Sequence, residues 1–333
     1  MIPSNLENAI YGLVSTPALH LADRHGMFRQ LRSGGPATAR ALAEGSGVDP
    51  DTTERLLLVL VAFGVLERDT GGRYTIPEPV APYLDADDPR YVGGFVEHLI
   101  SNSPTRLPRL EQYLARGKAS VDAELPAPFE TFYKDEAAVA AFMDAMWNLS
   151  FDVSRELAEL AAYDPNAHLV DVGGASGPFA VASLLHVPTL RATVFDLPEV
   201  EPYLRKNGQR FGVADRLSFV AGDFFADELP EGDRISFGYV LSDWTDETCL
   251  SLLRKAHRAC RPGGQVMVME RLFDDDRGGP LATAVMNLEM HVETQGRHRT
   301  AAEYVDLLTE AGFTDCRVAR SRREKHLIAG RVP

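Results

Sequence analysis

A glycine-rich turn between a strand-like and a helical segment is the first feature that points to ligand chemistry. Asp171 lies in an apolar segment, Gly173 and Gly174 follow directly, and residues 179–185 continue as an apolar helical stretch. Glycine has no side chain, so a ligand can lie against the backbone of such a turn, which also tolerates unusual dihedral angles. We therefore predict that this turn binds a ligand.

Two carboxylates follow at the ends of the next two strand-like segments. Asp196 lies about twenty residues beyond the turn, the separation at which an acid accepts hydrogen bonds from a ribose diol. Asp223 ends the third segment and is followed by Phe224. An acid can accept a hydrogen bond from the edge of an adenine ring, and an aromatic side chain can pack against its face. A dinucleotide oxidoreductase would carry Gly-x-Gly-x-x-Gly, whereas residues 173–177 read Gly-Gly-Ala-Ser-Gly. A single adenosyl group without a pyrophosphate is the better prediction.

The elements that position these residues have the pattern of an α/β domain. After residue 165, apolar strand-like runs alternate with helical stretches, which predicts a largely parallel, doubly wound sheet covered on both faces. The final two runs, residues 314–318 and 325–329, are joined by a short link and predict an antiparallel hairpin at the sheet edge. The expected strands are residues 168–172, 192–195, 217–220, 235–241, 266–269 and 326–329.

The first hundred residues predict helices with one small wing. A short helix begins at Pro36, a second runs over residues 53–64, and the segments 65–69 and 73–76 flank a Thr-Gly-Gly turn. This order is typical of a winged helix, which binds DNA or pairs two subunits. The second helix is rich in Leu and Val and poor in Lys and Arg, so we favour pairing over a DNA-binding regulator.

Residues 90–160 are again helical in pattern. Pro104, Pro108, Pro126 and Pro128 are predicted to break this region into pieces. Residues 142–151 carry aromatic and methionine side chains at helical spacing, which fits either a core helix or the wall of an apolar substrate pocket.

Composition limits the classes of function. A chain of 333 residues is long for one domain, and a net charge of −14 disfavours nucleic acid and anionic membranes. The sequence has no apolar run of membrane-spanning length and no signal-peptide pattern at its start, so we expect a cytoplasmic protein. Its three widely spaced cysteines predict neither disulfides nor a zinc site, and no short ligand spacing predicts another metal.

Six motifs follow one another at consistent spacing along the chain. They are Asp-Val-Gly-Gly (171–174), Phe-Asp-Leu-Pro (195–198), Gly-Asp-Phe-Phe (222–225), Val-Leu-Ser-Asp-Trp (240–244), Arg-Pro-Gly-Gly (261–264) and Gly-Arg-His-Arg-Thr (296–300). The series resembles the plant caffeate-type and bacterial natural-product O-methyltransferases, and the resemblance covers the whole chain. It implies S-adenosylmethionine as cofactor, a Rossmann-like catalytic domain, and an N-terminal winged-helix domain that pairs two subunits and closes each partner's substrate pocket.

The resemblance also implies a domain order and a cofactor site. We expect a winged-helix dimerisation domain at residues 1–95, a linker with substrate-pocket helices at 96–160, and the cofactor-binding catalytic domain at 161–333. The residues predicted to contact or flank the cofactor are Asp171, Gly173, Gly174, Asp196, Leu197, Asp223, Phe224, Ser242 and Trp244.

The catalytic residues depart from the family pattern. The family has a histidine as general base where this chain has Ser242, and an unactivated serine hydroxyl is too weakly basic for that task. His298 replaces a glutamate of the family motif, and imidazole can accept a proton near neutral pH. The alternative is that His298 lies in a surface loop and only forms a hydrogen bond with a backbone carbonyl group. His291 is a second candidate base, and Asp243 is expected to orient the substrate or a base. Glu270 is a further catalytic candidate, at the family's other acidic position after the fifth predicted strand.

We predict O-methylation of a small aromatic or polyketide-like hydroxylated molecule. The loss of the usual histidine keeps three alternatives open, which are carbon methylation, cofactor-dependent hydroxylation and a non-catalytic ligand-binding subunit. Well-held geometry alone can supply roughly 7–11 kcal/mol to such a displacement, so a strong base is not essential. The predicted substrate pocket contains Met146, Trp147, Met286 and Met290.

Overall fold

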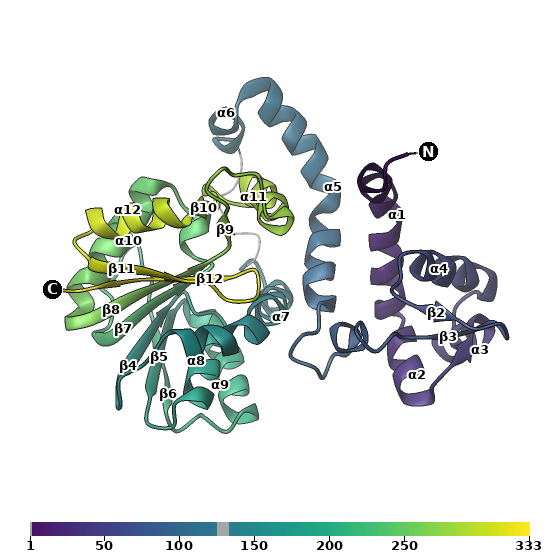
Figure 1. Cartoon of the computed structure of the whole chain (residues 1–333), viewed down its shortest axis with the longest axis horizontal. Coiled ribbons are helices and arrows are strands. Elements are labelled where there is room, and N and C mark those ends of the chain that lie inside the picture. Colours follow the sequence, from purple (N-terminus) through teal and green to yellow (C-terminus); the bar gives the residue numbers. More distant parts are fainter. Residues whose placement is uncertain (1, 125–132) are drawn as a thin grey trace. The chain divides into compact units, whose positions relative to one another are not determined.

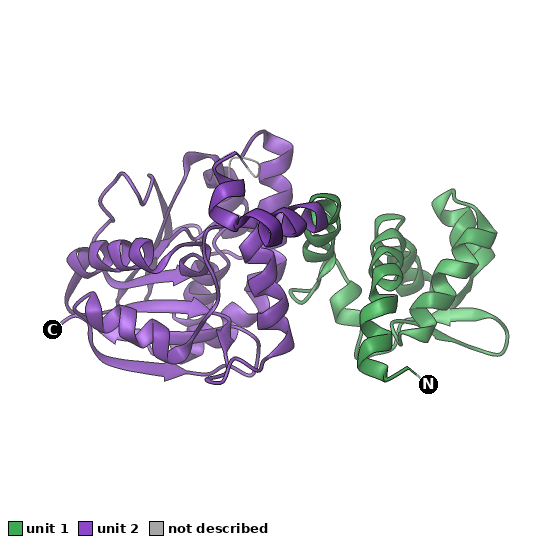
Figure 2. Ribbon diagram, turned by 90° about the horizontal axis from the view of Figure 1, so that it is seen from above, with its two compact units in different colours: residues 1–105 green, residues 106–333 purple. Residues whose placement is uncertain are grey.

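The chain folds into two compact units, one ending at Thr105 and the other beginning at Arg106 (Figure 2). The structure is a computed structural model that describes residues 2–124 and 133–333. Within these residues no helix combines the length and the apolar character needed to cross a lipid bilayer.

Helices and a small antiparallel sheet form the first unit. Leu57, Leu60 and Tyr74 are fully buried in its core, so a wing strand packs against a helix. Arg68 pairs with Tyr74 in the hairpin that the sequence predicts. The elements are α1 (Ser4–Arg24), α2 (Met27–Gly34), β1 (Ala37–Thr38), α3 (Ala39–Ser46), α4 (Pro50–Ala62), β2 (Glu67–Arg68), β3 (Arg73–Thr75) and η1 (Ala81–Leu84).

Long helices occupy the middle of the chain. Pro104 and Pro108 lie inside α5 (Gly93–Arg116), so the prediction that they break the helix was wrong. A proline removes one backbone donor, but the other hydrogen bonds of a 24-residue helix remain. The boundary expected between residues 95 and 96 also falls inside α5, while Pro126 and Pro128 lie outside the described residues. Two further helices follow, α6 (Lys118–Asp122) and α7 (Glu136–Leu160).

A seven-stranded sheet forms the centre of the second unit (Figure 1). From edge to edge its strands are β11 (Thr314–Ala319), β12 (His326–Arg331), β8 (Cys260–Glu270), β7 (Gly232–Gly238), β4 (His168–Val172), β5 (Arg191–Asp196) and β6 (Leu217–Ala221). The five strands from β8 to β6 are parallel, whereas β12 is antiparallel to both of its neighbours. This arrangement confirms the predicted α/β fold and the antiparallel hairpin at the edge.

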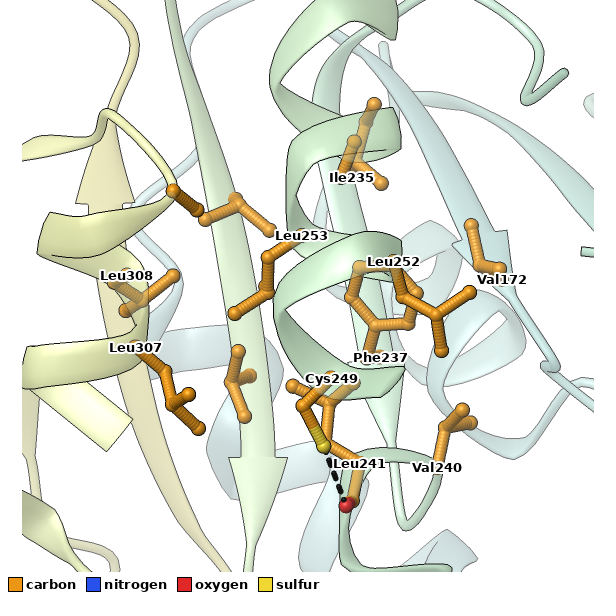
Figure 3. Close-up of a cluster of buried hydrophobic side chains, with 14 of the residues drawn as sticks. Val172, Ile235, Phe237, Val240, Leu241, Cys249, Leu252, Leu253, Leu307 and Leu308 are labelled. Atoms are coloured by element: carbon orange, nitrogen blue, oxygen red, sulfur yellow. Dashed lines mark hydrogen bonds between the residues drawn. The ribbon is translucent and has the colours of Figure 1, made fainter. Parts of the chain in front are cut away.

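Helices cover both faces of this sheet (Figure 1). On one face lie α7, α8 (Pro178–His186) and α9 (Glu201–Arg210), and on the other lie α10 (Asp246–Ala259) and α12 (Ala301–Glu310). Figure 3 shows Leu252 and Leu307 packing in one buried cluster with Phe237. The remaining elements are η2 (Pro198–Val200), η3 (Leu241–Asp243), β9 (Leu272–Phe273), α11 (Leu281–Glu293) and β10 (Arg299–Thr300).

The chain leaves the sheet at the end of β7 earlier than the apolar pattern suggests. The predicted strand ends at Leu241, whereas β7 ends at Gly238. Tyr239 has a φ of 57°, a left-handed conformation that interrupts the extended backbone and leads into η3. Apolar side chains continue through this turn because they pack in the core, so hydrophobicity did not mark the strand end. The turn carries Asp243 to the carboxyl edge of the sheet.

Candidate active site

A cavity of about 270 Å³ lies where β4, β5 and β7 end. Open parallel sheets bind ligands at this edge because loops from neighbouring strands converge there. Its lining includes most of the residues predicted from the sequence, namely Met146, Asp171, Gly173, Gly174, Asp196, Leu197, Asp223, Phe224, Asp243 and Trp244.

The turn after β4 depends on glycine at position 173. Gly173 has a φ of 63°, and its N–H donates to the carbonyl oxygen of Phe195 at 2.9 Å. A Cβ at this position would lie 2.8 Å from Cγ2 of Val240, which is closer than real Cβ atoms approach their neighbours. The absence of a side chain therefore lets the turn lie flat against the end of β7, where its backbone borders the cavity.

Asp196 is fixed at the end of β5 by the backbone of the neighbouring turns. The N–H of Ala175 donates to Oδ2 at 2.8 Å, and the N–H of Leu197 donates to Oδ1 at 2.7 Å. Burial raises the pKa of this carboxyl to about 6, although the two hydrogen bonds act to lower it. Each oxygen retains acceptor capacity, so a ligand diol can bind it from the cavity.

Asp171 lies close to the glycine turn, where a Cβ on Gly174 would be 2.8 Å from its Oδ2. The Ser236 hydroxyl donates to its Oδ1 at 2.5 Å. Burial raises the pKa of Asp171 to about 6, while this hydrogen bond and the Lys325 ammonium lower it. The Asp171 carboxylate and the Lys325 ammonium therefore belong to one set of charged side chains at the edge of the sheet.

Aromatic rings border the part of the cavity next to β6. Phe225 meets Phe224 at a centroid distance of 4.6 Å and Trp244 at 4.7 Å, both edge to face. Asp223 is exposed beside them, and its Oδ1 accepts from the N–H of Phe225 at 2.8 Å. The rings and the acid supply the flat apolar surface and the polar edge that suit an adenine.

The turn at residues 241–244 is held from behind by the segment that follows α11. The buried Arg299 guanidinium donates to the carbonyl oxygens of Leu241 and Trp244, each at 2.9 Å. A Cβ on Gly296 would lie only 2.1 Å from the carbonyl oxygen of Ser242, so this glycine packs directly on the turn. These contacts fix the backbone that carries Asp243.

Among the four residues predicted to act in catalysis, Asp243 is the one that lines the cavity. Burial raises its pKa well above the usual value, and the neighbouring Glu270 and Glu293 carboxylates raise it further. Glu270 is fully buried, and burial raises its pKa too. Glu270 Oε1 accepts from the backbone N–H of Ser242 at 3.2 Å, and Ser242 is likewise buried outside the lining.

The two candidate histidines lie outside the lining of this cavity. His298 is buried rather than on a loop surface, so that alternative was wrong. Burial lowers its pKa to about 3, with further lowering from Arg271 and Arg299, and its Nδ1 lacks a hydrogen-bond partner within the described part of the chain. His291 is exposed on α11, where its ring meets Tyr113 edge to face at 5.3 Å.

The predicted substrate-pocket residues separate into two groups. Met146 lines the cavity, whereas Trp147 is buried and stacks on Phe151 at 4.3 Å. Met286 and Met290 lie on α11, outside this lining. Phe142 and Ser150, from the segment 142–151 that fitted a pocket wall, also line the cavity, as do Tyr133, Phe225, Tyr239 and Lys325, which were not predicted as site residues. Phe225 lies in a motif that marked the site, but nothing local to Tyr239 or Lys325 signals a site.

The residues present fit an adenosyl cofactor. A buried carboxylate with free acceptor capacity, a side-chain-free turn and a cluster of aromatic rings all border one cavity. Among residues 2–124 and 133–333 no cluster of three His, Cys, Asp or Glu side chains has the arrangement of a metal site.

Two domain families match this chain. Residues 116–314 match the O-methyltransferase domain, and residues 8–81 match the O-methyltransferase dimerisation domain. The first match alone covers more than half of the chain.

Known proteins are similar over nearly the full length. The tetracenomycin polyketide synthesis 8-O-methyltransferase TcmO of Streptomyces glaucescens is 33% identical over 304 residues, which cover 91% of this chain and 89% of the relative. Acetylserotonin O-methyltransferase of Bos taurus is 34% identical over 333 residues, with 96% and 94% covered. The crystal structure of human N-acetylserotonin methyltransferase in complex with S-adenosylmethionine superposes with a TM-score of 0.88, at 31% identity, covering 98% of this chain and 96% of that one.

The expected family, fold and cofactor are thus confirmed. This chain belongs to the S-adenosylmethionine-dependent O-methyltransferase family.

Proposed function

We propose that the protein methylates a phenolic or enolic hydroxyl group on a small aromatic or polyketide-like natural-product intermediate. The observation that carries this proposal is the lining of the cavity, which includes Tyr133, Phe142 and Met146 together with the acid Asp243. Flat aromatic and flexible methionine side chains suit a planar apolar ligand, and the acid provides one polar contact. The relative TcmO is named for polyketide synthesis, which supports the same substrate class.

The cofactor, when bound, supplies an electrophilic methyl group on a sulfonium sulfur. Asp196 would accept hydrogen bonds from the ribose hydroxyls, and Phe224 and Trp244 would border the adenine. Gly173 and Gly174 would let the backbone approach the cofactor closely. The protein thereby holds the two reactants in alignment and excludes water from between them.

Asp243 is our proposed general base. Its carboxylate reaches the cavity, and burial beside Glu270 and Glu293 raises its pKa. A higher pKa makes a carboxylate a stronger base, so Asp243 can accept the hydroxyl proton of the substrate as the methyl group is transferred. His298 and His291 remain alternative bases. The low pKa of His298 argues against it, because a nitrogen with a pKa of about 3 is a weak base.

We also propose that the N-terminal region pairs two subunits. Residues 8–81 match a dimerisation domain, and α1 exposes a row of apolar side chains that includes Leu6, Ile10 and Leu13. An exposed apolar row on one helix favours association with another apolar surface. The proposed division is dimerisation over residues 1–95, pocket helices over 96–160 and catalysis over 161–333.

Incubation of the purified protein with methyl-labelled S-adenosylmethionine and a panel of phenolic and polyketide acceptors tests the substrate class. We expect label on an oxygen of at least one planar hydroxylated acceptor, located by mass spectrometry and NMR. Label on carbon or a hydroxylated product would contradict the proposed O-methylation. Transfer only to aliphatic alcohols would contradict the proposed substrate class.

A further inference from the structure

Lys325 is a buried cation at the edge of the cavity. It directly precedes β12 and its side chain lines the cavity, although the residue is only 2% exposed. The lining contains four aspartates, and among its described residues Lys325 is the only one with a cationic side chain.

The ammonium group of Lys325 has room for a partner. Across residues 2–124 and 133–333 its Nζ donates no hydrogen bond and has no carboxylate oxygen within 4.0 Å. It lies 3.8 Å from the centroid of the Tyr239 ring, which stabilises a cation but satisfies none of its three donors. It also lies 3.1 Å from the place where a Cβ on Gly238 would be, so the space beside it depends on that glycine.

Two carboxylates favour the charged form of this lysine against the effect of burial. Burial lowers the pKa of Lys325 to about 8 and Arg271 also acts to lower it, while the Glu270 and Asp171 carboxylates act to raise it. A buried ammonium without a directly contacting anion is costly in free energy, and such a group gains most from an anionic ligand that reaches it. The position of Lys325 at the cavity therefore favours the binding of a ligand carboxylate beside its ammonium group.

The distribution of charge along the cavity matches the cofactor. S-adenosylmethionine carries a sulfonium, an ammonium and one carboxylate at the methionine end. Asp196 ends β5, whereas Lys325 precedes β12, which lies beyond β4, β7 and β8 in the strand order. The Lys325 ammonium itself lies beside Gly238 at the end of β7. If the ribose lies at Asp196, as proposed above, the methionine portion extends toward the strands on the side of Lys325.

We propose that Lys325 binds the α-carboxylate of the methionine portion of S-adenosylmethionine and so fixes that end of the cofactor. This inference rests on the proposed position of the ribose. The lysine acts as a cofactor-binding residue contributed by the last strand of the sheet.

Calorimetry with two ligands tests the assignment. S-adenosylmethionine and its decarboxylated analogue differ in the carboxylate alone. We expect the unmodified protein to bind the intact cofactor at least tenfold more tightly than the analogue. Lys325→Met should weaken binding of the intact cofactor at least tenfold, change binding of the analogue less than threefold, and so remove the preference. Lys325→Arg should retain most of the preference because it keeps the charge.

Lys206→Met, at an exposed position on α9, is the matched control and should leave both affinities unchanged. An equal loss of affinity for both ligands in Lys325→Met would overturn the proposal, since it would indicate a purely structural role. Equal binding of the two ligands by the unmodified protein would also overturn it, even if the variant fails to fold. If the unmodified protein prefers the intact cofactor but Asp196→Asn does not weaken either ligand, the ribose assignment fails instead.

Discussion

Asp196 and Asp243 are both acids with raised pKa values, but their contacts give them different tasks. Two backbone N–H groups hold the Asp196 carboxylate in one orientation, which suits binding. Asp243 faces the cavity beside two further carboxylates, Glu270 and Glu293, which disfavour its charged form. A site that contains a fixed acceptor and a more basic acid can separate cofactor binding from proton transfer.

Cofactor affinity should depend on pH through Asp196. The pKa of its carboxyl is raised to about 6, so the anion that accepts ribose hydrogen bonds is fully present above that pH and is lost as the pH falls. We expect the dissociation constant for S-adenosylmethionine to rise up to about tenfold per pH unit below 6. Calorimetry between pH 5 and 8 measures this effect. Asp196→Asn should bind S-adenosylmethionine at least tenfold more weakly at pH 7.5, and its affinity should no longer depend on pH in this range. If the variant keeps the same pH profile, the titrating group is Asp171 and not Asp196.

Turnover should depend on Asp243 as a base. Replacing it by asparagine keeps the shape but removes the basic oxygen, so we expect kcat to fall by about 10² to 10⁴ with little change in cofactor affinity. In the unmodified protein kcat should rise with pH as Asp243 deprotonates, and the variant should lack this rise. His298→Ala provides the comparison. A larger loss of kcat in His298→Ala than in Asp243→Asn would transfer the role to the histidine.

At the scale of elements, the short turn η3 has few hydrogen bonds of its own and relies on a distant segment. Arg299 in β10 donates to two carbonyl oxygens of this turn and also pairs with Asp246 at the start of α10. Gly296 lies against the same turn, where a methyl group would clash with its backbone. Asp243, the proposed base, is thereby positioned by residues more than fifty places further along the chain.

Removing the Arg299 side chain should destabilise the protein and the site together. Arg299→Ala removes the guanidinium donor from two buried carbonyl groups and breaks the ion pair with Asp246, and we expect the free energy of unfolding to fall by about 3 to 5 kcal/mol. Arg297→Ala is the matched control, because Arg297 is 38% exposed and also contacts Asp246; its loss should stay below about 1 kcal/mol. Urea denaturation measures both. Equal effects of the two substitutions would show that the carbonyl contacts contribute little.

At the scale of the whole molecule, apolar exposure is concentrated on the N-terminal helix. Leu13 is 79% exposed, and Leu6, Ile10 and Val14 are also exposed on α1. The apolar side chains of α8, by contrast, are almost all buried against the sheet. In the proposed dimer, these apolar side chains of the first unit would be buried against a second copy of the chain instead of being exposed to water.

Acidic substitutions on α1 should separate the proposed dimer. In Ile10→Asp/Leu13→Asp two carboxylates would have to be buried at the interface, so we expect a particle with the mass of one chain in sedimentation or light scattering. Leu185→Asp introduces an acid at an exposed apolar position on α8 and should remain dimeric. A double variant that keeps the mass of two chains would place the interface elsewhere.

Much of the fold followed from local patterns. Alternating apolar segments predicted the sheet because each buried strand must be apolar over most of its length, and the closing hairpin followed from its short link. The cofactor-binding side of the site was also accessible, since Gly173, Asp196 and Asp223 each lie at a strand end within a recognisable motif. In parallel sheets such ends meet at one edge, so position along the sequence implies proximity in space.

The remaining parts depended on packing between segments that are distant in sequence. Trp147 and Met146 are neighbours in one helix, yet Met146 borders the cavity and Trp147 is buried in the core. Burial, together with the charges of Arg271 and Arg299, changed His298 from a candidate base to a weakly basic side chain. Lys325 reached the cavity because β12 runs antiparallel to β8 and brings its first residues to the carboxyl edge. The sequence by itself determined the family, the sheet and the motifs that we propose bind the cofactor. Only the tertiary structure decided which charges share the cavity, because burial and electrostatic coupling arise from contacts that no local pattern encodes.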